Sequence, residues 1–77
     1  MTELEQDFLE VHSLMLEWRG KENYRVPPEA IRRIFNAHNK VTGHLEYSVS
    51  CAGCRSRTWT RLKEWYDANL ETYKYLI

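Results

Sequence analysis

The stretch Ser50-Cys51-Ala52-Gly53-Cys54-Arg55-Ser56-Arg57 brings two thiols and two guanidinium groups to the expected start of a long amphipathic helix. Its first residue, Ser50, belongs to the residue types that cap helix N-termini. Apolar residues then recur at helical spacing, at Trp59, Leu62, Trp65, Tyr66, Leu70, Tyr73 and Ile77. This pattern predicts a helix over residues 51–75, which would be the longest element of the chain.

A capping signal marks the start of a first helix. Thr2 and Glu5 have the spacing of a capping box, in which each side chain accepts a hydrogen bond from the other residue's backbone N–H. We therefore expect a helix over residues 3–18. Its apolar residues cover a wide arc, whereas one neighbouring helix needs a stripe of only about 100°. Either both other helices pack against it, or one of them and another copy of the chain, and we expect self-association into at least a dimer.

Proline and glycine delimit a second helix. Pro28 suits the first turn of a helix and Thr42-Gly43 supplies a stop signal, so a helix is predicted over residues 28–41. The segments 19–27 and 44–49, which flank this helix, are expected to be loops. The predicted fold is all-α, a small bundle of three helices in which the third is the longest and starts at the Cys-x-x-Cys pair.

Length and composition set further limits. The chain of 77 residues corresponds to one domain over residues 1–77, a size at which a single core is only marginally stabilising without a metal, a disulfide or a partner subunit. Three Trp, five Tyr and two Phe residues indicate a folded chain. No apolar run approaches the roughly 20 residues of a membrane span, and the N-terminus lacks a secretory signal pattern. We expect a cytoplasmic protein with no membrane contact.

The formal net charge of zero hides an asymmetry. Residues 1–22 carry six acids against two bases, whereas residues 25–63 carry eight bases against two acids. A basic half of this kind suits nucleic acid, a nucleotide or an acidic protein surface as its partner. The alternative is that the acidic helix neutralises the basic residues within the protein or in a neighbouring copy.

The two cysteines, Cys51 and Cys54, are too close in sequence to connect distant parts of the fold, and their spacing is typical of metal ligands or redox pairs. Zinc needs about four ligands, and the nearest further candidates are His38 and His44, in a His-x5-His-x6-Cys-x2-Cys pattern. On an ideal helix both thiols border the core face. The sequence therefore leaves three alternatives open: a zinc site that staples the structure, a thiol pair, or two small core residues.

A cluster of cationic and aromatic residues follows the cysteines. Arg57 and Arg61, four residues apart, form a ridge, and Arg55 lies one turn before Trp59, within reach for stacking. Arg55 also falls on the apolar side of an ideal helix, where its charge would need a carboxylate or a bound anion. A helix N-terminus attracts anions. These four residues are the candidate site for a macromolecular partner, or for the phosphates of a nucleotide or nucleic acid.

No set of residues predicts catalysis. The sequence has no glycine-rich phosphate loop, no serine nucleophile motif and no isolated carboxylate pair, so we expect a protein that is not an enzyme. Reading of a DNA major groove along the whole third helix is disfavoured, because Glu64, Asp67 and Glu71 are expected on its outward face.

The second half of the chain carries a resemblance to a known group of proteins. Its elements are Phe35, Asn36, Thr42, Gly43, Ser50, Cys51, Cys54, Arg55, Leu62 and Lys63. In this pattern the chain resembles small uncharacterised proteins of tailed bacteriophages. The resemblance implies an accessory protein of the host-cell cytoplasm that binds a host protein or a signalling nucleotide and performs no chemistry of its own. It assigns no activity to a particular residue.

Overall fold

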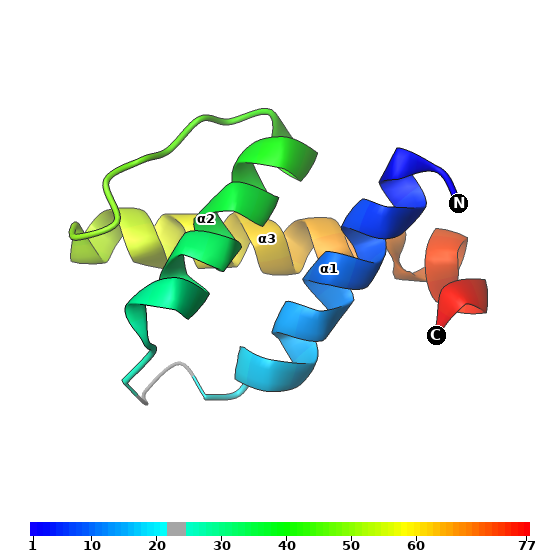
Figure 1. Cartoon of the computed structure of the whole chain (residues 1–77), viewed down its shortest axis with the longest axis horizontal. Coiled ribbons are helices and arrows are strands. Elements are labelled where there is room, and N and C mark those ends of the chain that lie inside the picture. Colours follow the sequence, from blue (N-terminus) through cyan, green and yellow to red (C-terminus); the bar gives the residue numbers. More distant parts are fainter. Residues whose placement is uncertain (22–24) are drawn as a thin grey trace.

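The computed structural model describes residues 1–21 and 25–77. It contains three α-helices and a final turn of 3-10 helix: α1 (Glu3–Trp18), α2 (Pro28–Thr42), α3 (Ala52–Tyr73) and η1 (Lys74–Leu76) (Figure 1). The helix α3 has 22 residues and is the longest, and the described residues include no strand. The predicted all-α bundle of three helices is confirmed. The predicted loop over residues 19–27 includes residues 22–24, which lie outside the described residues.

The predicted capping box of α1 and the predicted stop signal of α2 are confirmed, and α2 ends at Thr42, one residue beyond the predicted bound. The backbone N–H of Glu5 donates to Thr2 Oγ1 at 3.2 Å, and the N–H of Thr2 donates to Glu5 Oε1 at 2.7 Å, which completes the capping box. At the end of α2, Gly43 adopts the left-handed conformation with φ of 75°. A residue with a Cβ would be strained in this conformation, so glycine ends the helix at this position.

The start of α3 differs from the prediction. Cys51, not Ser50, is the N-cap residue, and its Sγ accepts a hydrogen bond from the backbone N–H of Cys54 at 3.2 Å. The N–H of Cys51 in turn donates to the carbonyl of Ser48 at 3.0 Å, which fixes the approach of the loop. At its other end, the α-helix stops at Tyr73, and the chain continues as η1.

The core lies where the three helices meet, and each helix packs against the other two (Figure 1). Phe8, Leu14 and Leu62 are fully buried in it. The rings of Phe8 and Tyr66 stack at a centroid distance of 5.4 Å, and Tyr66 Oη shares a hydrogen bond of 2.8 Å with His12 Nδ1 at the edge of the core. The two helices α2 and α3 therefore cover most of the wide apolar arc of α1 within one chain, and Leu4 and Leu16 of this helix stay exposed.

Ion pairs join the acidic first helix to the basic second helix. Arg33 Nη2 lies 3.0 Å from Glu10 Oε1, and Lys40 Nζ lies 2.9 Å from Asp7 Oδ1. The carboxylates raise the pKa of Arg33 and of Lys40, since they stabilise the charged forms. The acidic helix thus neutralises a large part of the basic side of α2. No helix among the described residues combines the length and apolarity of a membrane span.

Candidate functional site

A groove of about 720 Å³ lies between the end of α1, the start of α2 and the first half of α3. It combines apolar and cationic side chains from these three parts of the chain. Its apolar wall includes Trp18, Val26, Ile31, Ile34, Phe35 and Trp59, and its cationic members are Arg25, Arg55 and Lys63. The volume falls in the range of small-molecule pockets, about 300–1,000 Å³.

The floor of the groove is built by the amphipathic spacing of α2. Ile31, Ile34 and Phe35 recur at helical intervals, so all three face the same side of the helix. Ile34 is 7% exposed and Phe35 is 3% exposed, and both belong to the buried part of the protein. Ile34 also belongs to the hydrophobic core, so the floor of the groove continues into the core of the protein.

The rim of the groove is cationic. Arg55 is exposed, and among the described residues no side-chain hydrogen bond or ion pair engages its guanidinium group. Lys63 Nζ lies 5.8 Å above the ring of Trp59, one turn away on the same helix. None of the described residues that line the groove is acidic. The groove thus has an apolar floor and a positively charged edge.

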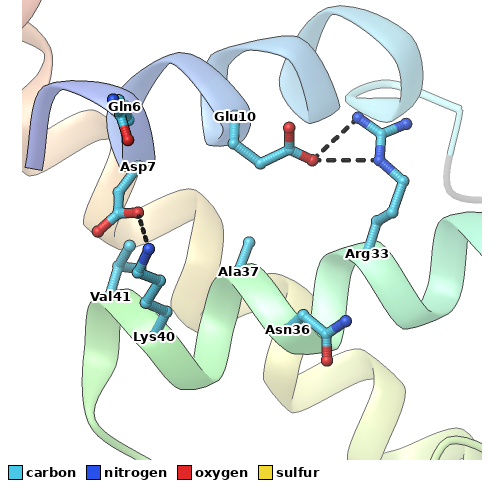
Figure 2. A pocket seen from close by; sticks show the side chains of 8 residues that line it. All are labelled: Gln6, Asp7, Glu10, Arg33, Asn36, Ala37, Lys40 and Val41. Carbon is cyan, nitrogen blue, oxygen red and sulfur yellow. Dashed lines mark hydrogen bonds and ion pairs between the residues drawn. The ribbon is translucent and has the colours of Figure 1, made fainter. Parts of the chain in front are cut away.

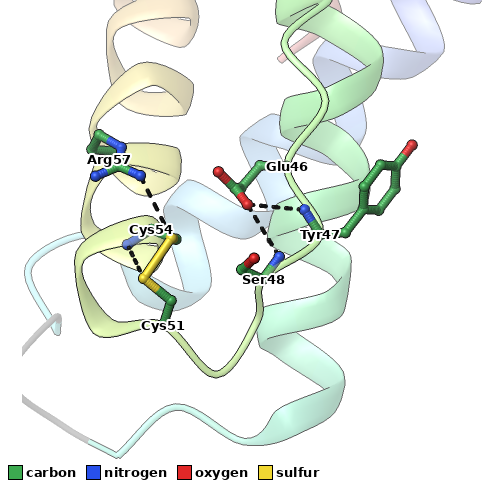
Figure 3. Close-up of a disulfide and its surroundings, with 6 residues drawn as sticks. All are labelled: Glu46, Tyr47, Ser48, Cys51, Cys54 and Arg57. Atoms are coloured by element: carbon green, nitrogen blue, oxygen red, sulfur yellow. Dashed lines mark hydrogen bonds between the residues drawn. A yellow bond between two sulfur atoms is a disulfide. The ribbon is translucent and has the colours of Figure 1, made fainter.

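The structure divides the four residues of the predicted binding cluster. Arg55 and Trp59 line the groove, whereas Arg57 and Arg61 do not. Arg57 lies beside the disulfide, where its Nη2 donates to Cys54 Sγ at 3.5 Å (Figure 3). Arg55 lines the groove together with the apolar side chains of Phe35 and Trp59, but it is exposed. Its long side chain reaches solvent from the flank of the apolar stripe.

Sequence reasoning missed two cations of the groove, Arg25 and Lys63. Lys63 had a local signal, since it follows Trp59 by four residues, the spacing that brings side chains together on a helix. Arg25 had no such signal. Its position depends on how the chain enters α2, which is a tertiary feature.

The predicted zinc ligands do not come together. His38 is fully buried, its Nδ1 pairs with Asn39 Oδ1 at 2.8 Å, and its Nε2 has no partner among the described residues. His44 is exposed in the loop after α2. Cys51 and Cys54 are joined to each other in a disulfide. Within residues 1–21 and 25–77, no three His, Cys, Asp or Glu side chains form a group that could hold a metal ion.

The two cysteines also differ in exposure, which the sequence did not predict. Cys54 is 9% exposed and borders the core as expected, but Cys51 is exposed, because an N-cap residue lies outside the helical spiral. The neighbouring carboxylate of Glu46 accepts hydrogen bonds from the backbone N–H groups of Ser48 and Tyr47, each at 3.1 Å (Figure 3). These bonds, together with the charge of Arg57, hold the pKa of Glu46 below its usual value.

A second pocket, of about 380 Å³, lies between α1 and α2 (Figure 2). Its charged residues are Asp7, Glu10, Arg33 and Lys40. They pair with one another across the pocket, as the dashed lines in Figure 2 show. This pocket therefore offers no excess charge to a ligand, in contrast to the groove.

No family model, no curated protein sequence and no solved structure matches the chain.

Proposed function

We propose that this chain is a non-enzymatic binding protein of the phage accessory type, which binds and modulates a host protein through the groove. The observation that carries this proposal is the combination of a buried apolar floor with the cationic residues Arg25, Arg55 and Lys63 on its rim. Arginine and tryptophan are enriched among the residues that dominate protein interfaces. Arg55 and Trp59 lie side by side in the groove lining and are the anchors we propose.

The chemistry of the groove favours an acidic partner segment. A large apolar side chain of the partner would lie on Ile31 and Phe35, and carboxylates beside it would meet the cationic rim. Charge complementarity of this kind speeds association and selects partners, and salt screens it. Binding should therefore weaken as the salt concentration rises.

A nucleotide or nucleic-acid phosphate is the alternative occupant of the same groove. The side of Trp59 offers a surface for stacking a base, and Arg55 near the start of α3 offers a charge for a phosphate. This alternative predicts that a small ligand raises the melting temperature, since a ligand that binds only the folded state stabilises it. A panel of nucleotides and short DNA oligomers tests it by thermal shift.

A matched pair of charge reversals tests the main proposal. Arg55→Glu changes the groove, whereas Arg61→Glu makes the same charge change on the same helix outside the groove. We expect host proteins captured from bacterial lysate by the wild type to be retained by Arg61→Glu and lost by Arg55→Glu. With the purified partner, Arg55→Glu should weaken binding by at least about tenfold. Equal affinities of the two variants would place the binding surface elsewhere.

Site-specific cross-linking gives a second, independent test. A photoreactive residue at Thr60, which lines the groove, should cross-link to the partner. The same residue at Glu64, which is exposed on α3 and does not line the groove, should not. Cross-linking at Glu64 alone would contradict the proposed site.

We further propose a cytoplasmic location and self-association. Since α2 and α3 cover most of the arc of α1, a dimer contact would use the apolar side chains that stay exposed. Leu16 on α1 is 71% exposed, and Leu45 in the loop after α2 is 70% exposed. Exposed apolar side chains of this size are candidates for contacts between copies.

A further inference from the structure

We propose that Cys51 and Cys54 form a thiol–disulfide exchange centre, in which Cys51 reacts with an external thiol and Cys54 is the resolving cysteine. The external thiol belongs to a low-molecular-weight thiol such as glutathione, or to a protein dithiol. This inference uses residues that do not line the groove, and it stands independently of the proposed partner binding.

The first observation is the difference in accessibility between the two sulfur atoms. Cys51 precedes the first residue of α3 and is exposed, whereas Cys54 lies one turn into the helix and is 9% exposed. An incoming thiolate must approach the disulfide from solvent along the S–S axis. Only the Cys51 end of the bond is open to that approach.

The second observation is that each sulfur has a hydrogen-bond donor. The backbone N–H of Cys54 donates to Cys51 Sγ at 3.2 Å, and Arg57 Nη2 donates to Cys54 Sγ at 3.5 Å (Figure 3). Donors and a nearby cation stabilise the thiolate forms that appear when the disulfide opens. The positive end of the α3 dipole acts in the same direction.

The third observation is that the disulfide connects no separate elements of the fold. It closes a sequence separation of three residues, within the first turn of one helix. The backbone of this turn is already held by the bonds from Arg55 N to Cys51 O and from Cys51 N to Ser48 O. A disulfide in this position connects no second element of the fold. We therefore expect that its reduction and re-formation leave the packing of the helices unchanged.

The exchange is balanced as follows. An external thiolate attacks Cys51 Sγ, the bond between Cys51 and Cys54 breaks, and its electron pair leaves on Cys54 Sγ beside Arg57. The product is a mixed disulfide between Cys51 and the external thiol. A second external thiolate attacks the external sulfur of this mixed disulfide and releases the Cys51 thiolate. The protein disulfide is reduced to two thiols, and two external thiols are oxidised to one disulfide.

Alkylation of the reduced protein identifies the reactive cysteine. We would treat the reduced chain of 77 residues with limiting iodoacetamide at neutral pH and map the products by peptide mass spectrometry. Cys51 should be modified at least about tenfold faster than Cys54. Equal rates, or faster modification of Cys54, would overturn the proposal. Because the wild-type chain is used, a failure of a variant to fold does not affect this result.

Mixed-disulfide trapping tests the division of roles. Cys54→Ser should form a stable adduct with glutathione disulfide at Cys51, whereas Cys51→Ser should react much more slowly. Circular dichroism checks that both variants are folded. Similar adduct formation by both folded variants would refute the assignment of Cys51 as the reacting cysteine.

The role of Arg57 is tested by a matched pair of variants. Arg57→Met should slow the reduction of the disulfide by glutathione several-fold, and Arg61→Met, which removes a charge one turn further along α3, should not. An equal effect of the two substitutions on the rate of reduction would contradict the specific role of Arg57. The rate would then depend only on the general positive charge of the helix. A disulfide that millimolar glutathione does not reduce at all would refute the exchange centre itself.

Discussion

The substitution Thr58→Val should stabilise the protein, although it removes a polar group from the first half of the longest helix. Thr58 is fully buried between its neighbours in the bundle, and its Oγ1 has no hydrogen-bond partner among the described residues. A hydroxyl buried without a partner costs about 1–3 kcal/mol in proteins. Valine has almost the same shape and a nearly equal helix propensity, so the packing around the site should be kept.

The expected gain in the free energy of unfolding is about 1–2 kcal/mol, which includes the burial of one additional methyl group. For a domain of this size, 1 kcal/mol corresponds to a rise in melting temperature of about 4–8 °C. Urea unfolding measures the free energy of unfolding, and thermal unfolding measures the melting temperature. Both are followed by the far-ultraviolet circular dichroism of the helices.

Two further variants are the controls for this prediction. Thr58→Ser keeps the hydroxyl and removes a methyl group, so it should lose about 1 kcal/mol. Thr72→Val makes the same exchange at an exposed position of α3 and should change stability by less than about 0.5 kcal/mol. A loss of stability in Thr58→Val would refute the reasoning. It would mean that the hydroxyl forms a bond in solution, for example to the backbone carbonyl of Cys54, four residues earlier.

Three other predictions concern the core, the pH dependence and the assembly state. Leu62→Ala should lower the free energy of unfolding by about 2–5 kcal/mol, because Leu62 is fully buried, and Tyr47→Ala at an exposed position should have little effect in the same urea titration. The hydrogen bonds from Arg19 lower the pKa of Asp67, so this pair contributes stability at neutral pH that is lost as the pH falls through the range below about 4. Asp67→Asn should therefore be less stable than the wild type near pH 7 and equal to it at low pH. Light scattering at micromolar concentration should give at least the mass of a dimer, and the mass of a monomer would contradict self-association.

The helices could be predicted from the sequence because their signals are local. The capping box of Thr2 and Glu5 and the positive φ of Gly43 involve residues within one turn of the helix ends, and the structure confirms both. The apolar spacing of α3 likewise placed Leu62 on the buried side. Such signals do not depend on how the helices are arranged, which is why the fold class followed from them.

The candidate site could be predicted only in part, because it depends on that arrangement. Arg55 and Trp59 were found from α3 alone, but Arg25 reaches the same groove from the chain before α2. Cys51 was assigned to the core side by projection onto an ideal helix. This projection does not apply to an N-cap residue, whose backbone is extended, with φ of −85° and ψ of 115°. His38 was grouped with the cysteines by sequence distance, whereas its burial and its bond to the next residue separate it from them.

The net charge of zero does not describe the charge around the groove, on which the proposed partner binding depends. The acids of α1 are paired with Arg33 and Lys40 of α2, and Asp67 of α3 is paired with Arg19. Together these contacts engage five carboxylates, those of Glu3, Asp7, Glu10, Glu17 and Asp67, with three cations, and none of these residues is among the described residues of the groove lining. Among its described residues the lining has the cations Arg25, Arg55 and Lys63 and no acid, and this local composition is the basis of the proposed preference for an acidic partner. A neutral protein can therefore select an acidic partner, provided that its own acids are bound elsewhere in the fold.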